Sequence, residues 1–595
     1  MDTIKRLFDI PSFQLENYDL SIAFVTKYDG EWQSISTKEY NDSANNLSQA
    51  LLELGVKPNN KIAIITNRTR TEWHIADIAI MQVGAQSVPI YDSTSLADME
   101  YIFNHAEVKY CFAATEEIFL KINSIKDKIP TLVEIISFDE IDQCNSINDY
   151  INHGVSIDLS PEVDTIKNNI TENDLATIIY TSGTTDKPKG VMLTHKNIIS
   201  NILASVSVLP EIKGNDKKGL SFLPVSHIFE RMMLYLYQYS GFSIYFAESI
   251  ETISTDLQTV KPHVITAVPR LLEKIHDRII SKGNDLKGIK KRLFNWALEI
   301  GYQYEPDGAN GRKYEKKLAR ARKLIFSKWR AALGGNIKAI YCGSAKLQPS
   351  ISRIFCAAEL YVLDGYGLTE TSPVISVNTT YPDMNKIGTI GKPISCADVK
   401  ISEKNEILVK GPSVMIGYYK DKEKTERSIV NGYFHTGDCG LLDEDGFLHI
   451  TGRIKENFKT SGGKYINPSK IEILLKKSNL IEQAMVIGEG EKMPAAIIQP
   501  NFEWIKTWIK KNSISLEPSR IELIKEQNVL DLFQAEIDKV NESLGQWEKI
   551  KRFELTYDEW TIGAGHLTPT LKVKRDIIKS KYYILYNKIY RPFIG

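Results

Sequence analysis

The sequence has no excess charge of either sign, because its 595 residues include 74 Lys plus Arg and 74 Asp plus Glu. A chain without net positive charge has no overall field that attracts nucleic acid non-specifically. Any attraction for anions must therefore come from local groups of side chains, and we expect no nucleic-acid partner.

Long hydrophobic runs are also missing. The longest uncharged run, residues 232–247, is shorter than the roughly 20 residues that a membrane-spanning helix needs, and Ser240 and Gly241 interrupt it. It favours a buried helix that ends near Gly241, followed by the strand FSIYF. The first residues, MDTIKRLFDIPSF, lack an apolar core of secretory length. A cytoplasmic protein is therefore expected.

Cysteine is sparse, with six residues scattered along the chain and no CxxC pair. This spacing favours reduced, buried thiols over disulfides or a zinc site. The sequence has no internal repeat and no low-complexity tract, so it predicts a globular protein without repeat architecture.

What the chain does contain is a regular alternation of strand and helix patterns. Apolar strand-like runs occupy residues 61–66, 85–91 and 108–113, and helical patterns occupy 73–82 and 96–106. Such alternation predicts layered α/β architecture with largely parallel sheets. A charged helical stretch follows at about 282–334, and near Gly452 the composition changes to a final segment richer in Lys. This length favours more than one domain.

The decapeptide TSGTTDKPKG, residues 181–190, follows the apolar run LATIIY and is typical of a phosphate-binding loop. A Walker loop is excluded, because Pro188 stands where that motif requires glycine and no GK[ST] follows. The run VML then predicts a second strand, and Thr194 predicts the N-cap of a helix. Backbone amides, hydroxyls, Lys187 and Lys189 of such a strand-to-strand loop suit phosphates. The alternative is an ordinary Ser/Thr/Gly turn.

This decapeptide resembles the loop TSGTTGxPKG of the AMP-forming acyl-activating ligases, the family of acyl-CoA synthetases, luciferases and peptide-synthetase adenylation domains. Each motif alone is a common turn, but their shared order is specific. LPVSHIFER at 223–231, the helical stretch near 283–334 and the last motif look most like the long-chain fatty-acyl-CoA synthetase branch. Six further family motifs occur in order: DGYGLTE at 364–370, GTIGKP at 388–393, HTGD at 435–438, GRIKE at 452–456, SGGKYINP at 461–468 and LTPTLKVKR at 567–575.

The resemblance implies the residues that perform the chemistry. Lys572 is implied as the adenylating lysine, and Thr369 as a contact of the α-phosphate. Glu370 and Thr181 are implied as oxygen ligands of Mg²⁺, the ion that meets the charge on the leaving pyrophosphate.

It also implies the residues that bind the nucleotide. Tyr366 is expected to stack on adenine, and Asp438 and Arg453 to hold the ribose. The family places a histidine or an aromatic residue at the position of His227, so we expect a pocket wall there, although a lone histidine beside apolar residues is more often part of the core. The other implied contacts are Ser182, Gly183, Thr184, Thr185 and Lys189 in the loop, and Gly343, Asp364 and Gly365 at the adenine edge.

Two positions depart from the family pattern. Asp186 stands where the family has glycine, and aspartate is among the few residues that tolerate positive φ, so we expect a working loop. Leu571 stands where many relatives have glycine before the lysine, but LTPTLK is common in the long-chain branch. Met232, Met233, Tyr235 and Tyr237 at helical spacing fit either a core stripe or an acyl tunnel.

The second half-reaction requires a rearrangement, because the thiol of CoA must reach a carbonyl that the adenylating lysine has just covered. By resemblance, Lys455 is the hinge, and Gly462 and Gly463 line the pantetheine tunnel. The expected organisation is a large α/β nucleotide- and acyl-binding domain over residues 1–451, a hinge at 452–455, and a small mobile α+β lid over 456–595.

Two regions have a local excess of basic residues, at about 313–330 and 572–591. Such runs are usually solvated faces, but both also suit an anionic membrane surface or the phosphates of CoA. Peripheral contact with the inner face of a membrane and a homodimer stay open at this point.

The function implied is a long-chain fatty acid–CoA ligase that uses ATP, Mg²⁺ and CoA. One alternative loads the acyl group onto the phosphopantetheine of a carrier protein. Another is a catalytically silent, lipid-binding regulatory protein, for which Asp186 is the sequence indication.

Overall fold

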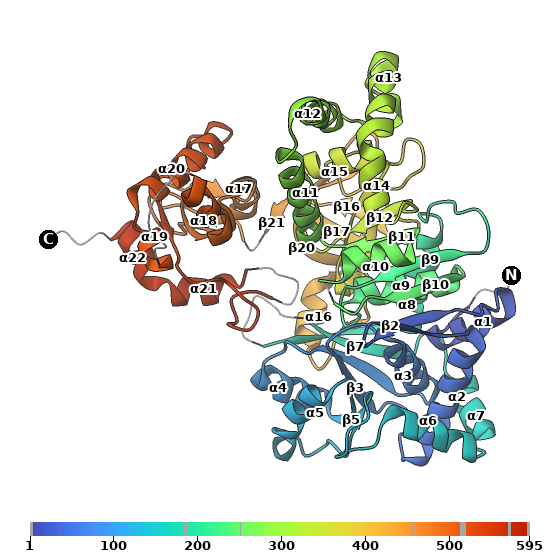
Figure 1. Cartoon of the computed structure of the whole chain (residues 1–595). Coiled ribbons are helices and arrows are strands. Elements are labelled where there is room, and N and C mark those ends of the chain that lie inside the picture. The colour runs from blue at the N-terminus through green and yellow to red at the C-terminus, as the bar shows by residue number, and fades with distance from the viewer. Residues whose placement is uncertain are drawn as a thin grey trace. The chain divides into compact units, whose positions relative to one another are not determined.

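A computed structural model of the chain describes residues 4–181, 187–249, 251–454, 456–511, 519–568 and 573–591 (Figure 1). The chain divides into two compact units. The first unit comprises residues 1–400, 408–436 and 442–449, and the second comprises 401–407, 437–441 and 450–595. The predicted architecture, a large multi-sheet α/β part followed by a smaller α+β part, is confirmed.

One sheet of the first unit has seven strands in the order β18-β8-β7-β4-β3-β5-β6. The strands from β7 to β6 are parallel, whereas β8 and β18 are antiparallel to their neighbours. Buried β-branched and aromatic residues dominate these strands, as expected for a sheet that is covered on both faces. Their bounds are β3 Lys61–Thr66, β4 Gln86–Tyr91, β5 Val108–Ala113, β6 Glu134–Ser137, β7 Leu175–Thr181, β8 Lys189–Thr194 and β18 Gly417–Tyr418.

Helices follow these strands, and the two after β3 and β4 lie at the predicted places. The helix α3 spans Thr71–Gln82, α4 spans Leu96–Ala106 and α5 spans Glu116–Asn123. Thr194 caps α8 (His195–Val206), because its hydroxyl accepts a hydrogen bond from the amide of Asn197. Before them in the chain lie α1 (Ile10–Asn17) and α2 (Thr37–Glu53), and between β6 and β7 lie α6 (Ile147–Ser156) and α7 (Ser160–Asn169).

The second sheet has nine strands in the order β15-β14-β13-β12-β11-β9-β10-β1-β2. Its six central strands, β13 to β1, run parallel, and the antiparallel strands lie at the edges. The bounds are β1 Phe24–Tyr28, β2 Glu31–Ile35, β9 Lys217–Ser221, β10 Phe242–Phe246, β11 Val264–Ala267, β12 Ala339–Cys342, β13 Val362–Gly367, β14 Val374–Val377 and β15 Lys392–Pro393.

The helix α9, Ile228–Tyr239, links the two sheets through two buried charged residues in its first turn. The carboxylate of Glu230 accepts hydrogen bonds from Ser221 on β9 and Thr266 on β11. Burial raises the pKa of Glu230 to about 7, although these two hydrogen bonds act to lower it. This side chain therefore ties α9 to the nine-stranded sheet.

The next residue, Arg231, faces the seven-stranded sheet. Its guanidinium donates to both oxygens of Asp77 on α3 at 2.7–3.1 Å and to the hydroxyl of Thr177 on β7 at 2.8 Å. Both members of this ion pair are fully buried. None of the helices in the described parts of the chain combines the length and hydrophobicity needed to span a bilayer, α9 included.

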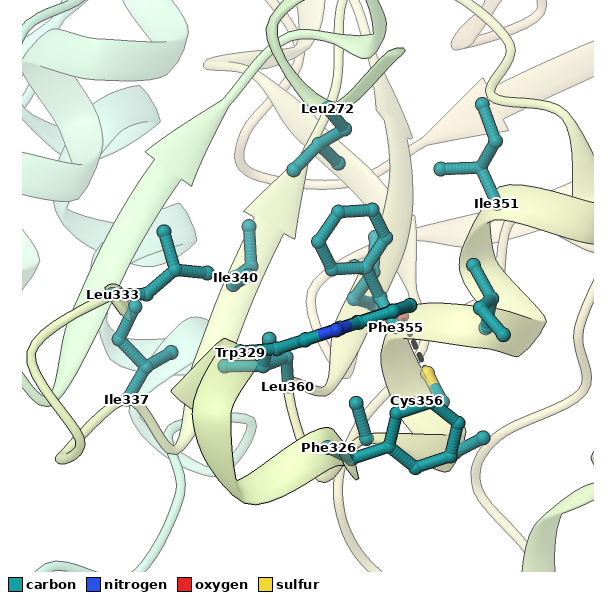
Figure 2. Close-up of a cluster of buried hydrophobic side chains, with 14 of the residues drawn as sticks. Leu272, Phe326, Trp329, Leu333, Ile337, Ile340, Ile351, Phe355, Cys356 and Leu360 are labelled. Carbon is teal, nitrogen blue, oxygen red and sulfur yellow. Dashed lines mark hydrogen bonds between the residues drawn. The ribbon is translucent and has the colours of Figure 1, made fainter. Parts of the chain in front are cut away.

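The predicted charged stretch is a set of helices that belongs to the first unit. Large apolar side chains anchor it: Phe326 and Trp329 lie 5.0 Å apart between ring centroids and pack with Phe355 in one buried cluster (Figure 2). The outer surface of these helices is therefore held on a packed base. The stretch contains α12 Gly288–Tyr302, α13 Gly311–Ala321, a π-helical segment Arg322–Phe326 and α14 Ser327–Ala332. The neighbouring helices are α10 Ile253–Val260 and α11 Pro269–Asn284 before it and α15 Pro349–Ala357 after it.

The second unit has its own apolar core, in which helices pack on the three-stranded sheet β24-β25-β26. A short hairpin, β22 (Phe458–Lys459) and β23 (Tyr465–Ile466), precedes it. The elements that follow the hairpin are α17 Pro468–Leu475, β24 Ile481–Ile487, β25 Ala495–Pro500, α18 Phe502–Lys511, α19 Arg520–Leu523, α20 Gln527–Glu542, β26 Phe553–Leu555, α21 Arg575–Lys581 and α22 Tyr583–Tyr590. The strands β20 Tyr433–Leu442 and β21 Leu448–Arg453 precede the hairpin.

Candidate active site

Some of the predicted site residues lie outside the described residues. Their roles stay predictions, and the geometry below concerns the others. The residues outside are Ser182, Gly183, Thr184, Thr185 and Asp186 of the phosphate loop, the hinge residue Lys455, and Leu571 and Lys572 of the last motif.

The strands β7 and β8 bring the two ends of the phosphate loop together. They pair antiparallel, and Thr181 lies opposite Lys189 in the register. The hydroxyl of Thr181 is buried and makes no hydrogen bond with any described residue. A buried hydroxyl with no partner among the described residues fits a group that receives a ligand.

Lys189 and Glu370 form a buried polar cluster beside this hydroxyl. The Lys189 ammonium lies 2.7 Å from Oε1 of Glu370, a residue of the short 3-10 helix Thr369–Thr371. The hydroxyl of Tyr418 on β18 donates to the same oxygen at 2.9 Å. The side chain of Glu370 is only 8% exposed. Burial acts to raise its pKa, but the Lys189 charge together with the hydrogen bonds that the carboxylate accepts holds the pKa below its ordinary value.

Tyr418 is a site residue that the sequence analysis did not identify. Its hydroxyl lies 2.9 Å from the ammonium of Lys189, and the ammonium lies 4.5 Å from the centroid of its ring. Burial, together with the Glu370 carboxylate, raises the pKa of this phenol, so Tyr418 remains a hydrogen-bond donor. The dipeptide Gly417-Tyr418 was the only local feature of the sequence that could have indicated this residue. Nothing in it predicts pairing with a strand more than 220 positions earlier.

The predicted adenine-edge residues gather where β12 and β13 end. Cys342, which precedes Gly343, pairs with Asp364, and Gly365 and Tyr366 follow on β13. A Cβ at Gly365 would lie 3.3 Å from the carbonyl oxygen of Ser376, so glycine lets the strands approach closely. Asp364 accepts a hydrogen bond from Ser352 at 3.0 Å. Burial raises the pKa of Asp364 to about 7.

His227 is the N-cap of α9, and its Nδ1 accepts a hydrogen bond from the amide of Phe229 at 3.2 Å. The ring of Phe229 lies 3.4 Å from the position that a Cβ of Gly343 would occupy. The helix start that carries His227 therefore borders the adenine-edge residues, and His227 itself is half-buried. Its role as a pocket wall stays a prediction.

The four residues of the proposed acyl stripe on α9, Met232, Met233, Tyr235 and Tyr237, are all at most 3% exposed. The hydroxyl of Tyr235 donates to Asp77. This contact joins Tyr235 to the buried hydrogen-bond network of Arg231, which fits a role of these residues in the core. That they line an acyl tunnel stays a prediction.

The second unit contains the predicted ribose pair. Nε of Arg453 donates to Oδ1 of Asp438 at 2.7 Å, and Asp438 is buried whereas Arg453 is partly exposed. Gly462 and Gly463 lie in the turn between β22 and β23, where Gly463 has φ +76° and no atom within 4 Å of a built Cβ. The turn therefore requires a residue that tolerates positive φ.

Comparisons with known proteins give matches along most of the chain. Residues 14–419 match the family described as AMP-binding enzyme, and residues 457–591 match the AMP-binding enzyme C-terminal domain. The chain belongs to the AMP-binding enzyme family. Among its relatives in this family is the long-chain-fatty-acid–CoA ligase FadD15 of Mycobacterium bovis, 32% identical over 94% of this chain and 93% of that protein. The fatty acyl-CoA synthetase A of Dictyostelium discoideum is 30% identical over 95% of this chain and 87% of that protein.

Solved structures share the fold at lower identity. The anthranilate CoA ligase AuaEII in complex with anthranoyl-AMP superposes with a TM-score of 0.70 at 17% identity, covering 97% of both chains. The Mycobacterium tuberculosis fatty acyl CoA synthetase gives a TM-score of 0.63 at 17% identity, covering 98% of this chain and 99% of that one. At these identities the likeness concerns the fold alone.

Proposed function

We propose that this AMP-binding enzyme is a long-chain fatty acid–CoA ligase that forms an acyl-AMP from a fatty acid and ATP, releases pyrophosphate, and transfers the acyl group to CoA. The observation that carries the proposal is the pairing of Lys189 with Glu370 beside the hydroxyl of Thr181, which has no hydrogen-bond partner among the described residues. The choice of a long-chain acid is supported by the names of the relatives and by the motifs of the long-chain branch.

The chain's residues suit a magnesium nucleotide. Glu370 is an ionised hard-oxygen ligand, and Thr181 offers a hydroxyl that has no described partner. Magnesium bound there would supply stabilisation of the charge on the leaving pyrophosphate. Lys189 keeps Glu370 ionised and is itself suited to a phosphate oxygen. Thr369 is assigned as a contact of the α-phosphate, and Lys572 is assigned as the residue that stabilises the transition state of adenylation.

The remaining assignments bind the nucleotide and CoA. Asp438 and Arg453 hold the ribose, Tyr366 stacks on adenine, and Asp364 accepts from its edge. Lys455 is the hinge between the domains predicted at 1–451 and 456–595, and Gly462 and Gly463 line the pantetheine tunnel. A cytoplasmic location and a homodimer stay predictions.

An exchange assay tests the function. Labelled pyrophosphate should exchange into ATP when the full-length protein receives a long-chain acid, and exchange should fall as the acid is shortened towards acetate. Thioester formation should then be faster with CoA than with a carrier-protein phosphopantetheine. Preference for the carrier would favour the alternative ligase, and no exchange with any acid would favour the silent lipid-binding protein.

Replacement of Glu370 by glutamine should raise the Mg²⁺ concentration for half-maximal exchange by about tenfold or more, because an amide is a poorer ligand for a hard cation. The measurement is exchange rate against free Mg²⁺ at saturating ATP. Glu72→Gln is the matched control, since it also removes a partly buried carboxylate from an ion pair, here with Arg70. An unchanged Mg²⁺ titration for Glu370→Gln would remove this residue from the metal site.

A further inference from the structure

Helix α13 has a row of exposed basic side chains that the proposed chemistry does not use. We call it the basic face: Arg312, Lys313, Lys316, Lys317 and Arg320, all exposed. Residues 282–330, which include it, contain 14 Lys and Arg against five Asp and Glu, although the whole chain has no net charge. The positive charge of this region is therefore a local feature of the insertion.

The spacing of these residues puts them on one side of the helix. Positions i, i+1, i+4, i+5 and i+8 share a face at 3.6 residues per turn. The opposite side is fixed to the protein, because Leu318 and Ala321 are fully buried and the hydroxyl of Tyr314 donates to the carbonyl oxygen of Ile300. Figure 1 places α13 at the outer edge of the first unit, far from β3 and β5. The basic face is thus held outward on a rigid base.

The two basic regions found in the sequence differ in how their charges are paired. In the second region, Arg575 pairs with Glu472, Lys581 with Asp558 and Lys588 with Glu554. In α13, which is described throughout, no side chain of the basic face lies within ion-pair distance of a described carboxylate. Local acids therefore pair with these three C-terminal basic residues, whereas the described acids pair with none of the basic face.

Apolar side chains are exposed at the edge of this charge. Leu324, just after α13, is 48% exposed and follows the exposed Lys323. Ile289 in the first turn of α12 is 75% exposed and precedes Lys290. Aliphatic residues among basic ones suit the headgroup region of a bilayer. Single-stranded nucleic acid is instead bound by aromatic platforms between basic residues, and the basic face of α13 contains no aromatic residue.

We propose that the basic face of α13 docks the protein peripherally on an anionic lipid bilayer. The proposal goes beyond the ligase activity and does not depend on the length of the acyl chain. A basic residue near an anionic bilayer strengthens binding by about fivefold, so loss of three should weaken it by about 100-fold. The attraction should disappear in high salt, because the Debye length falls to about 3 Å at 1 M.

Vesicle flotation of the full-length protein tests this. The probes are phosphatidylcholine vesicles with and without 30% phosphatidylglycerol, each at low and high salt. The test variant is Arg312→Gln/Lys316→Gln/Arg320→Gln. The matched control, Lys57→Gln/Lys109→Gln/Lys213→Gln, removes the same charge from exposed sites elsewhere in the first unit. We expect binding only to the anionic vesicles at low salt, about 100-fold weaker binding for the test variant, and wild-type binding for the control.

Two readouts keep the outcome decisive. Pyrophosphate exchange with a water-soluble medium-chain acid should be unchanged in both triple variants, because none of their residues belongs to the active site. A variant that loses flotation but keeps exchange has therefore lost docking and is not misfolded. Equal flotation of wild type and test variant, or binding independent of phosphatidylglycerol, would overturn the proposal. The basic face would instead bind nucleic acid if the wild type bound poly(U) more tightly than vesicles and the test variant lost that binding.

Discussion

Replacing Lys572 with alanine is expected to slow pyrophosphate exchange by about 10²–10³-fold, the usual effect of losing one preorganised donor to a developing charge. Adenylation moves negative charge onto the α-phosphate while the attacking carboxylate is itself anionic. A cation placed between them therefore stabilises the transition state more than either reactant. Thioester formation has no such need, so acyl-AMP supplied with CoA should be converted at a rate near that of the wild type.

The control for this experiment is chosen from the structure. Arg575 is unsuitable, because its guanidinium donates to both oxygens of Glu472 at 2.7 and 2.8 Å and holds α21 in place. Lys574→Ala changes a neighbouring charge outside any described ion pair. If Lys572→Ala slowed both half-reactions alike, or if Lys574→Ala had the larger defect in exchange, Lys572 would not be the adenylating residue.

Replacing Arg231 with methionine should lower the free energy of unfolding of the first unit by about 3–5 kcal/mol, because Asp77 then stays buried without a cation. The pair is fully buried, so water cannot compensate for the lost charge. The measurement is urea unfolding followed by tryptophan fluorescence, since Trp73 lies 5.3 Å from the guanidinium.

The surface pair of Arg427 and Glu423 provides the comparison, because both side chains are 75% exposed. Arg427→Met should change stability by at most about 1 kcal/mol. Equal losses in the two variants would mean that the buried pair contributes no more than a solvated one.

Local patterns in the sequence were sufficient to predict individual helices and strands. The helix expected at residues 96–106 has those bounds as α4, because a capping serine and apolar spacing lie within one short segment. The strand expected at 61–66 is β3, a run of buried β-branched residues. In both cases the determining residues are neighbours in the chain.

Contacts between distant segments could not be predicted in this way. Nothing around Asp77 indicates that Arg231, 154 positions later, is its partner. Likewise Lys189 was expected to contact phosphate. Its contacts with Glu370 and Tyr418 depend on how the 3-10 helix Thr369–Thr371 and β18 pack beside β8. The family motifs identified Glu370 through resemblance, whereas Tyr418 lies outside them.

The separation of Lys189 from its partners also has a consequence during synthesis. Glu370 follows Lys189 by 181 residues and Tyr418 follows it by 229. At 5–20 residues per second, the ribosome needs roughly 9 to 36 seconds to add Glu370 after Lys189. Throughout that time the nascent chain has the end of the nucleotide loop without the acidic residue that pairs with it. The cluster of Lys189, Glu370 and Tyr418 is therefore complete only after about two thirds of the chain has been synthesised.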